Sequence, residues 1–469
     1  MVYHLPLSIS NRTSSLIRVS HLSFNDLVPP RQTTPTKAIP SEIKIKHLKI
    51  SVSVELSRPN EILVQFVKQK RFSSRKRFWR LDVTYDQQNI NQINRMHQKG
   101  KRPTYEIFQS ISDDGSIALM ALESRDFSNW MSSLPDQVAL TSLTIPGSHQ
   151  SCALYGWPIA TCHTRPLSRQ LEDGIRFVDI GLALPHGLQG QLIAYNGFQS
   201  QLVSFHDILR ALITFLDKNP TEVIIINIKQ EDRTNGFNEA LKREILAIEG
   251  EEAFQNRWWL DSALPPSLGQ ARGKLILLSR GKDTPVMSKG IQFPNWPINS
   301  NCIWETQIST TNVAVQDWSN IGSFLSLPKK SSLACVSLCR ALHEPLANPP
   351  ALQENPQTEP SAKTNTQNIE INPAPKPDLK SNNQPETWVI NFLSASALAL
   401  AFPVICAKGF GWSKNGLGLE GVNSVIARWL VSRRESEGGA TVSGVVCVMD
   451  YYQSPKEALV SLLVDCNFR

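Results

Sequence analysis

Seven short apolar segments alternate with helix-like segments between residues 126 and 469, and this alternation constrains the fold most strongly. Segments such as VIIINI (223–228) are apolar on both faces, as parallel strands buried on both sides must be. The pattern is helical in the preceding segment, SFHDILRALITFLDKNP (204–220), whose apolar residues recur at three and four and which stops at Asn219-Pro220. This alternation predicts an α/β barrel in which one or two strands are irregular or not recognised in the sequence. The seven apolar segments are 141–147, 175–184, 191–197, 222–229, 274–280, 387–396 and 444–452.

Two other segments differ in composition and divide the chain. Residues 1–125 include stretches such as SEIKIKHLKISVSVEL (41–56) that alternate with period two, which predicts a smaller β-rich domain. Residues 346–386 are rich in Pro, Asn and Gln and almost free of large apolar side chains, which predicts a disordered insertion. We therefore expect the barrel to be built from two parts, 126–345 and 387–469, on either side of that insertion.

Composition and charge limit the class of protein. The chain is 41% hydrophobic and 19% charged, typical of a soluble globular protein, and its net charge of +7 over 469 residues gives no reason to expect a nucleic-acid partner. No apolar run reaches the roughly 18 residues that span a bilayer, and no secretory signal is recognisable at the N-terminus. These features predict a cytoplasmic protein with reduced cysteines. Pairing of Cys152 with Cys162 is the alternative in an oxidising compartment.

Polar side chains stand at the C-terminal ends of the predicted strands, where α/β barrels carry their chemistry. These residues are His149, Asp179, Asn196, Lys229, Glu231, Arg280, Ser394 or Ser396, and Asp450. Because the set combines a base with cations and carboxylates, it predicts a site that handles phosphate.

The segments around these strand ends resemble a known family. They are TSLTIPGSHQS (141–151), LSRQLEDGIRFVDIGL (167–182), TEVIIINIKQE (221–231) and VVCVMDYYQSP (445–455). In this order they resemble the X domain of phosphatidylinositol-specific phospholipases C, particularly the fungal phospholipase C-like phosphodiesterases. The resemblance covers roughly residues 126–469 apart from the predicted insertion. It implies a distorted TIM barrel that cleaves phosphodiesters by general acid–base catalysis.

The resemblance also implies roles for individual residues. One histidine deprotonates the inositol 2-hydroxyl, which attacks phosphorus, and a second histidine protonates the leaving alkoxide. An arginine, or Ca2+ in the calcium-dependent relatives, neutralises charge on the phosphoryl oxygens. The catalytic positions fall on His149, the base, and Asp450, which orients it. The substrate-binding positions fall on Gln150, Asp179, Asn196, Lys229 and Glu231.

Two positions depart from the family's pattern. The family's arginine is Gly181 here, and its second histidine is Asn196. Because asparagine is not a useful proton donor, the loss of the acid is expected to lower the rate by about 10²–10⁴-fold. Two functions therefore remain: a phosphodiesterase acting on inositol phospholipids or a related phosphodiester, and a non-catalytic descendant that binds a phosphorylated headgroup or a protein partner.

Three replacements for the missing groups are conceivable. His186 or His206 would replace the acid, and Arg280 would replace the cation. No cofactor is otherwise expected, but Ca2+ bound by Asp179, Glu231 and Gln150 is a third replacement.

A basic stretch runs from Lys68 to Arg80 and contains seven Lys or Arg together with Phe72, Phe78 and Trp79. Basic residues with aromatic rings favour peripheral contact with an anionic membrane, which would suit a phospholipid substrate. A solvated hairpin loop, a nuclear-import signal and a nucleic-acid contact are the alternatives. A further hypothesis assigns lipid or protein binding to residues 1–125.

Overall fold

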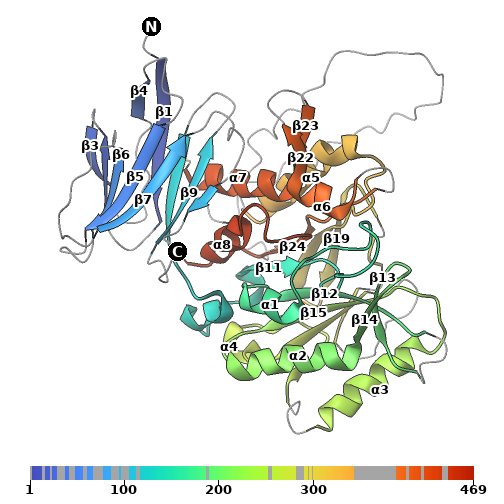
Figure 1. Ribbon diagram of the computed structural model, residues 1–469. Helices are drawn as coiled ribbons and strands as arrows, with labels where there is room; N and C mark the ends of the chain where they lie inside the picture. Colours follow the sequence, from blue (N-terminus) through green and yellow to red (C-terminus); the bar gives the residue numbers. More distant parts are fainter. Residues whose placement is uncertain are drawn as a thin grey trace, which may run out of the picture.

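The structure is a computed structural model (Figure 1). It describes residues 3–12, 16–21, 24–28, 37–41, 48–55, 61–66, 78–85, 94–96, 105–111, 117–185, 190–251, 256–280, 290–293, 295–297, 299–342, 387–397, 401–412, 417–435 and 442–468. Most of the basic stretch from Lys68 to Arg80, His186 and the predicted insertion at 346–386 lie outside the described residues.

Two five-stranded sheets are formed by the described N-terminal residues, in the orders β4-β1-β10-β9-β8 and β3-β2-β6-β5-β7. Their strands are β1 (Tyr3–Asn11), β2 (Leu16–His21), β3 (Phe24–Val28), β4 (Lys37–Ser41), β5 (Leu48–Glu55), β6 (Glu61–Phe66), β7 (Phe78–Tyr85), β8 (Asn94–Met96), β9 (Tyr105–Ile111) and β10 (Ile117–Glu123). Phe108 and Met120 of the first sheet are fully buried in the same apolar core as the rest of the chain. Ser461 donates a hydrogen bond of 2.9 Å to the carboxylate of Glu106. The first sheet therefore packs against C-terminal helices (Figure 1), and the boundary at residue 125 remains a prediction.

The rest of the chain forms a curved, mainly parallel sheet with the order β16-β17-β15-β12-β11-β24-β21-β20-β19. Its strands are β11 (Thr144–Ser148), β12 (Phe177–Ala183), β15 (Ile224–Gln230), β16 (Trp258–Trp259), β17 (Leu275–Arg280), β19 (Ile303–Ile308), β20 (Thr311–Gln316), β21 (Thr387–Phe392) and β24 (Val445–Met449). Every neighbouring pair from β16 to β20 is parallel, and β19 is antiparallel to β20. The predicted distorted TIM barrel is confirmed, as a sheet that the described strand pairs leave open between its two ends.

Helices flank this sheet (Figure 1). They are α1 (Leu167–Glu172), α2 (Phe205–Lys218), α3 (Phe237–Glu249), α4 (Leu268–Ala271), α5 (Leu327–Arg340), α6 (Pro403–Lys408), α7 (Val422–Glu435) and α8 (Ala458–Asp465), with 3-10 turns η2 (Phe127–Ser133), η3 (Leu140–Ser142) and η5 (Phe324–Ser326). In α2, the side chain of Ser204 accepts a hydrogen bond from the backbone N–H of Asp207 and caps the helix. The apolar face of α2 is buried, and the helix ends before Asn219-Pro220, as its sequence predicts. Within the described ranges, every helix is too short or too polar to cross a bilayer.

The prediction for the apolar segment at 191–197 was wrong in one respect. This segment forms β13 (Ile193–Asn196), which runs antiparallel to β12 and continues into β14 (Gln199–Ser204) as a hairpin on the side of the barrel. Several strands of this sheet were not among the predicted segments, and the longest of them are β19 and β20 together with β14. The sequences of β19 and β20 show why. Their sequences, IWETQI and TNVAVQ, interrupt the apolar pattern with polar residues because several of their side chains are not buried. Three short strands remain: β18 (Ile291–Phe293), which pairs with β17, and the separate pair β22 (Gly409–Trp412) and β23 (Leu417–Glu420).

A completely buried ion pair joins the start of β12 to the loop before β15. The guanidinium of Arg176 lies 2.7 Å from the carboxylate of Glu222, and neither side chain is exposed to solvent. The other guanidinium hydrogens bond to backbone carbonyls, including those of Phe127 and Ser128 in η2. The carboxylate also accepts a hydrogen bond from the backbone N–H of Met131. This pair holds η2 against the sheet.

Replacing Glu222 with glutamine is expected to lower the free energy of unfolding by about 3–5 kcal/mol, because the Arg176 charge stays buried without a counter-charge. Urea denaturation followed by circular dichroism measures the loss. Asp217→Asn is the matched control, since Asp217 pairs with Arg257 at the surface, and it should cost less than about 1 kcal/mol. Equal losses in the two variants would contradict the argument.

Candidate active site

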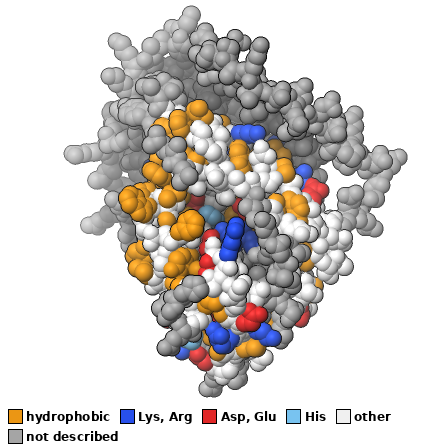
Figure 2. Space-filling view, turned by 90° about the vertical axis from the view of Figure 1, so that its right-hand side faces the viewer, with side chains coloured by type: hydrophobic (Ala, Val, Ile, Leu, Met, Phe, Trp, Pro, Cys, Tyr) orange, Lys and Arg blue, Asp and Glu red, His pale blue; other side chains and the backbone are white. Residues whose placement is uncertain are grey.

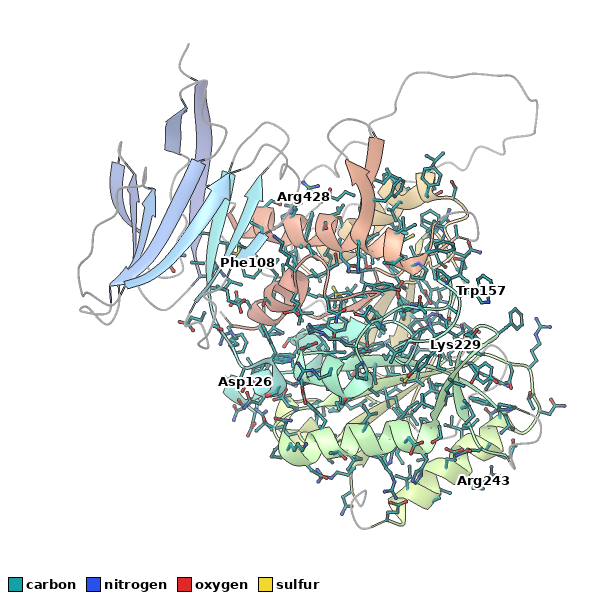
Figure 3. The ribbon with its side chains drawn as sticks, in the orientation of Figure 1. Phe108, Asp126, Trp157, Lys229, Arg243 and Arg428 are labelled. Carbon is teal, nitrogen blue, oxygen red and sulfur yellow. The ribbon has the colours of Figure 1, made fainter. Side chains whose placement is uncertain are left out.

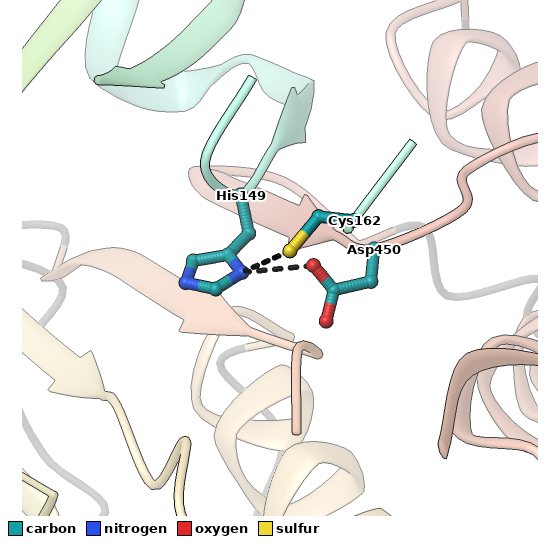
Figure 4. Close-up of side chains that lie close together, drawn as sticks. All are labelled: His149, Cys162 and Asp450. Carbon is teal, nitrogen blue, oxygen red and sulfur yellow. Dashed lines mark hydrogen bonds and ion pairs between the residues drawn. The ribbon is translucent and has the colours of Figure 1, made fainter. Parts of the chain in front are cut away.

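His149 stands directly after β11, at the C-terminal edge of the sheet. Its backbone N–H donates to the carbonyl of Met449 in the neighbouring strand β24, at 2.9 Å. The next residue, Gln150, has a positive φ of 43° and turns the chain sharply away from the strand. The imidazole Nδ1 of His149 lies 2.8 Å from Oδ1 of Asp450, which follows β24 (Figure 4). Two parallel strands therefore bring together residues 301 positions apart.

The carboxylate of Asp450 orients the imidazole of His149. Asp450 is buried, and the side chain of Asn423 in α7 donates to its backbone carbonyl at 3.0 Å. A carboxylate on Nδ1 holds the proton there and leaves Nε2 free to accept one. Burial lowers the pKa of His149, but the charges of Asp450, Asp179 and Asp317 outweigh burial, so its pKa is raised. The histidine is a stronger base than an ordinary one.

Asp179 on β12 is buried and contacts several groups of the site. One carboxylate oxygen accepts hydrogen bonds from Asn227 at 2.7 Å and from the guanidinium of Arg280 at 3.1 Å. The other accepts from the backbone N–H of Gln150 at 3.1 Å and lies 4.0 Å from Nε2 of His149. Burial raises the pKa of Asp179, but Arg280 and His149 outweigh burial, and the pKa is lowered. Asp179 is therefore an ionised carboxylate beside the free face of the imidazole.

Arg280 at the end of β17 brings a cation into this cluster. Its guanidinium bonds to Asp179 and also to Asp317, at 2.9 Å, and Trp296 donates to the same Asp317 carboxylate at 2.8 Å. The guanidinium also lies 5.1 Å from the ring centre of Trp296 and 5.3 Å from that of Phe392. Two carboxylates thus balance the charge of Arg280, which orders the site more than it offers an unpaired cation.

Gln150 and Glu231 fill the space above Gly181, and Lys229 pairs with Glu231. The amide of Gln150 donates to Glu231 at 2.5 Å and accepts from the backbone N–H of Gly181 at 3.2 Å. Lys229 donates to Glu231 at 2.9 Å and is 41% exposed. A Cβ on Gly181 would lie 2.4 Å from the carbonyl oxygen of Tyr195 and 2.6 Å from the Glu231 carboxylate. Only glycine fits there, while Lys229 remains accessible to a ligand.

Asn196, which stands at the position of the family's second histidine, lies beside Cys162, near Nδ1 of His149. Its amide donates to the carbonyl of Ala160 at 3.0 Å and lies 3.6 Å from the sulfur of Cys162. That sulfur is 3.9 Å from Nδ1 of His149. The structure therefore gathers all seven predicted site residues around one edge of the sheet. One group lies around His149 and the other above Gly181, and the contact between Gln150 and Asp179 links them.

Three residues of the cluster were not predicted: Cys162, Asp317 and Trp296. Asp317 follows β20, so the rule that placed polar residues at strand ends would have found it had β20 been recognised. No sequence signal identified Cys162, because it lies in a loop. Cys152 and Cys162 are both free thiols in the structure, which corrects the alternative in which they pair.

Comparisons with known proteins agree with this architecture. Residues 137–281 match the X domain of phosphatidylinositol-specific phospholipase C. The 1-phosphatidylinositol phosphodiesterase of Listeria monocytogenes is 33% identical over 157 residues, 32% of this chain and 48% of the relative. That of Staphylococcus aureus (strain Newman) is 27% identical over 208 residues, 40% of this chain and 63% of the relative. The chain thus spans less than two thirds of these relatives, and the predicted resemblance is confirmed for the matched part.

The fold is also similar to that of a solved structure. A structure of the Staphylococcus aureus phosphatidylinositol-specific phospholipase C superposes with a TM-score of 0.54 at 20% identity, over 73% of this chain and 98% of that one. At this identity the likeness establishes the shared fold. The X-domain match at 137–281 contains His149, Asp179, Lys229 and Glu231 but ends before Asp450. The pairing of His149 with Asp450 is therefore visible only in the tertiary structure.

Two of the replacements for the missing acid and cation are not favoured by the structure. His206 in α2 accepts a hydrogen bond from Arg210 and lies near Glu251, and neither of these contacts belongs to the cluster around His149. The carboxylates of Asp179 and Glu231 already pair with Arg280 and Lys229, and the Gln150 amide oxygen is engaged with Gly181. These residues therefore do not fit a Ca2+ site, which needs several free oxygen ligands.

Apolar side chains lie beside the His149 site on the surface. Figure 2 shows a histidine set back between acidic and basic side chains, with apolar side chains gathered beside it. Tyr155, Trp157, Phe198 and Leu202 are large exposed apolar residues, and Trp157 is 78% exposed. They belong to the loop after β11 and to the β13–β14 hairpin, and Trp157 lies on the same side of the molecule as Lys229 (Figure 3).

The pKa values of His149 and His163 are expected to shift in opposite directions from the usual value for histidine. Burial lowers the pKa of His163 to about 4, whereas the carboxylates raise that of His149. Protonation of His149 stabilises the fold below its unfolded pKa of about 6.5, and this contribution is lost as pH rises through its raised folded pKa. NMR titration of the imidazole resonances, assigned with single variants, measures both. Asp450→Asn should lower the pKa of His149, and an unchanged value would contradict the assignment of its cause.

Proposed function

We propose that this chain cleaves the phosphodiester of an inositol phospholipid, or of a related compound, with His149 as the general base. The observation that carries the proposal is the contact of 2.8 Å between Nδ1 of His149 and the buried carboxylate of Asp450. It leaves Nε2 as the proton acceptor, beside the Asp179–Arg280 pair. This is the arrangement that proton abstraction from a sugar hydroxyl requires.

The chemistry follows from the positions of the charges. Nε2 of His149 takes the hydroxyl proton while the oxygen forms a bond to phosphorus, and Asp450 stabilises the resulting imidazolium. Lys229, which is accessible, supplies positive potential for the phosphoryl oxygens, and Arg280 holds the Asp179 carboxylate in place. The bond from phosphorus to the leaving oxygen then breaks, and that oxygen takes a proton from water. Because Asn196 does not supply this proton, we propose a slow enzyme.

The substrate is proposed to be reached at a membrane surface. Tyr155, Trp157 and Phe198 are exposed on the segments that also carry Gln150 and Asn196. Aromatic side chains of this kind insert at the membrane–water interface. Peripheral contact through these three aromatic residues is independent of the contact predicted for residues from Lys68 to Arg80, which stays a prediction.

Vesicles test this proposal. Purified protein is incubated with phosphatidylinositol vesicles and with phosphatidylcholine vesicles, each with Ca2+ or with a chelator, and water-soluble phosphates are measured. Slow release of inositol phosphate from phosphatidylinositol alone, equal with and without Ca2+, is the expected result. Release that requires Ca2+ would refute the metal-independent mechanism.

A second candidate function is binding without catalysis. The filled space above Gly181 and the engagement of Asn196 with Ala160 favour it, because both family groups are replaced by residues that fit their surroundings. Sedimentation of the protein with phosphatidylinositol vesicles, without product and weakened by Lys229→Ala, would support binding and exclude cleavage.

A further inference from the structure

Three metal-binding atoms converge on the side of His149 that faces away from Asp179. They belong to His149, Cys162 and Asp450, and all lie within 4.8 Å of one another. Nδ1 of His149 is 2.8 Å from Asp450 and 3.9 Å from the sulfur of Cys162 (Figure 4). Among the residues that the structure describes, these three are the His, Cys, Asp and Glu side chains that lie close enough together to hold a metal ion.

The backbone holds these three side chains in place. The N–H of Tyr451, next to Asp450, donates to the carbonyl of Cys162 at 2.8 Å, and the N–H of Cys162 donates to Ala153 at 2.9 Å. The ring of His163 bonds to the carbonyl of His149 at 2.7 Å. Hydrogen bonds to the backbone thus hold the segments that carry the three ligands, so the cluster is organised before any ion binds.

We propose that His149, Cys162 and Asp450 form a binding site for a thiophilic divalent ion such as Zn2+. Imidazole, thiolate and carboxylate are the ligands that zinc takes, whereas Ca2+ and Mg2+ avoid sulfur. Zinc bond lengths imply ligand separations of about 3.3–3.6 Å around a tetrahedral ion. The N–O distance must open by about 0.5 Å and the N–S distance must close by about 0.3 Å, both within the reach of side-chain rotation.

Binding replaces one set of bonds with another. The S–H bond of Cys162 breaks, its proton leaves to solvent, and sulfur, Nδ1 and the Asp450 carboxylate each bond to the ion, with water as the fourth ligand. The proton that Asp450 holds on Nδ1 also leaves to solvent, and Nε2 takes up a proton from solvent, so the neutral imidazole bound through Nδ1 carries its proton on Nε2. His149 then has no lone pair for a substrate proton. Zinc therefore inhibits the enzyme, a consequence that rests on the proposed function, whereas the binding does not.

Cobalt(II) is the probe that reads the site without activity. The full-length protein is treated with a chelator, dialysed and titrated with Co2+, and a thiolate-to-cobalt charge-transfer band is expected in the near ultraviolet. Zn2+ should remove the band, and Ca2+ should not. In Cys162→Ala the band should disappear, and affinity for Zn2+ should fall by more than roughly 100-fold, beyond the cost of losing an outer partner.

Matched variants decide between this site and other thiols. Cys152 is buried in the same loop, and Cys302 is exposed beside Ser300. Cys152→Ala and Cys302→Ala should keep the band, and a band that depends on either of them would overturn the proposal. A band retained in Cys162→Ala, or no saturable band in the wild type, would also overturn it. If Cys162→Ala fails to fold by circular dichroism, the smaller change Cys162→Ser serves as the test.

Activity is a separate readout. Where phosphatidylinositol is cleaved, Zn2+ should inhibit the wild type and Cys152→Ala at the concentration that displaces cobalt, and should not inhibit Cys162→Ala. Equal inhibition of Cys162→Ala would refute the inhibitory mechanism. If no cleavage is found, the proposed function fails, and the cobalt band still decides the metal site.

Discussion

Replacing His149 with alanine is expected to lower kcat/KM for phosphatidylinositol cleavage by about 10²–10⁴-fold, the usual contribution of one general base. The physical reason is that Nε2 of His149 is the proton acceptor that Asp450 orients, at 2.8 Å from Nδ1. The other described histidine of the region, His163, donates to the carbonyl of His149 and does not replace it. Inositol phosphate release from vesicles, measured over a range of substrate concentrations, separates kcat from KM. The loss should fall on kcat, since the histidine acts on the proton.

His206→Ala is the matched control for that experiment. His206 is an exposed histidine that contacts Arg210 and Glu251, so its removal should leave the rate within about twofold, as expected for a surface residue. Thermal unfolding of each variant verifies the fold. Full activity of His149→Ala, with unfolding unchanged, would show that the base lies elsewhere and would end the proposed mechanism.

Replacing Asn196 with histidine is expected to raise the rate of cleavage, by up to about 10²–10⁴-fold, because it restores a proton donor for the leaving oxygen. Asn196 lies in the same cluster as His149, 3.6 Å from the sulfur of Cys162. An imidazole N–H can also take over its hydrogen bond to the carbonyl of Ala160. The vesicle assay across a range of pH measures the gain, and a second limb should appear at the alkaline side, where the new acid loses its proton.

Asn196→Gln is the control for this gain. It keeps an amide at the same place without adding an acid, so its rate should not rise. A rate of Asn196→His equal to that of Asn196→Gln, with both proteins folded, would mean that the leaving group does not pass this position. Arginine at 181 is not an equivalent repair, because a Cβ there would lie 2.4 Å from the carbonyl oxygen of Tyr195.

Short-range patterns were sufficient to predict much of the fold. The apolar segments that became β12 and β15 are buried along most of their length, and α2 ends where Asn219-Pro220 predicts. These features depend on residues close together in the chain, so the sequence alone contains them. The same holds for His149 and Lys229, which were predicted because chemistry gathers at the ends of parallel strands.

Contacts between distant segments decided the rest. The segment around Asn196 has the apolar pattern of a barrel strand, yet it pairs antiparallel with β12 as a hairpin, because strand direction depends on the partner. β20 carries Asp317 into the site although its sequence lacks a continuous apolar run.

The amino-acid sequence by itself determined the parallel barrel, the position of His149 and the two substitutions, Gly181 and Asn196. Only the tertiary structure decided that side chains fill the space above Gly181, that Arg280 is balanced by two carboxylates, and that Cys162 lies beside His149 and Asp450. The physical reason is distance along the chain. Strand patterns arise from neighbours, whereas the charge and free space of the site arise from side chains that meet only when the sheet has folded.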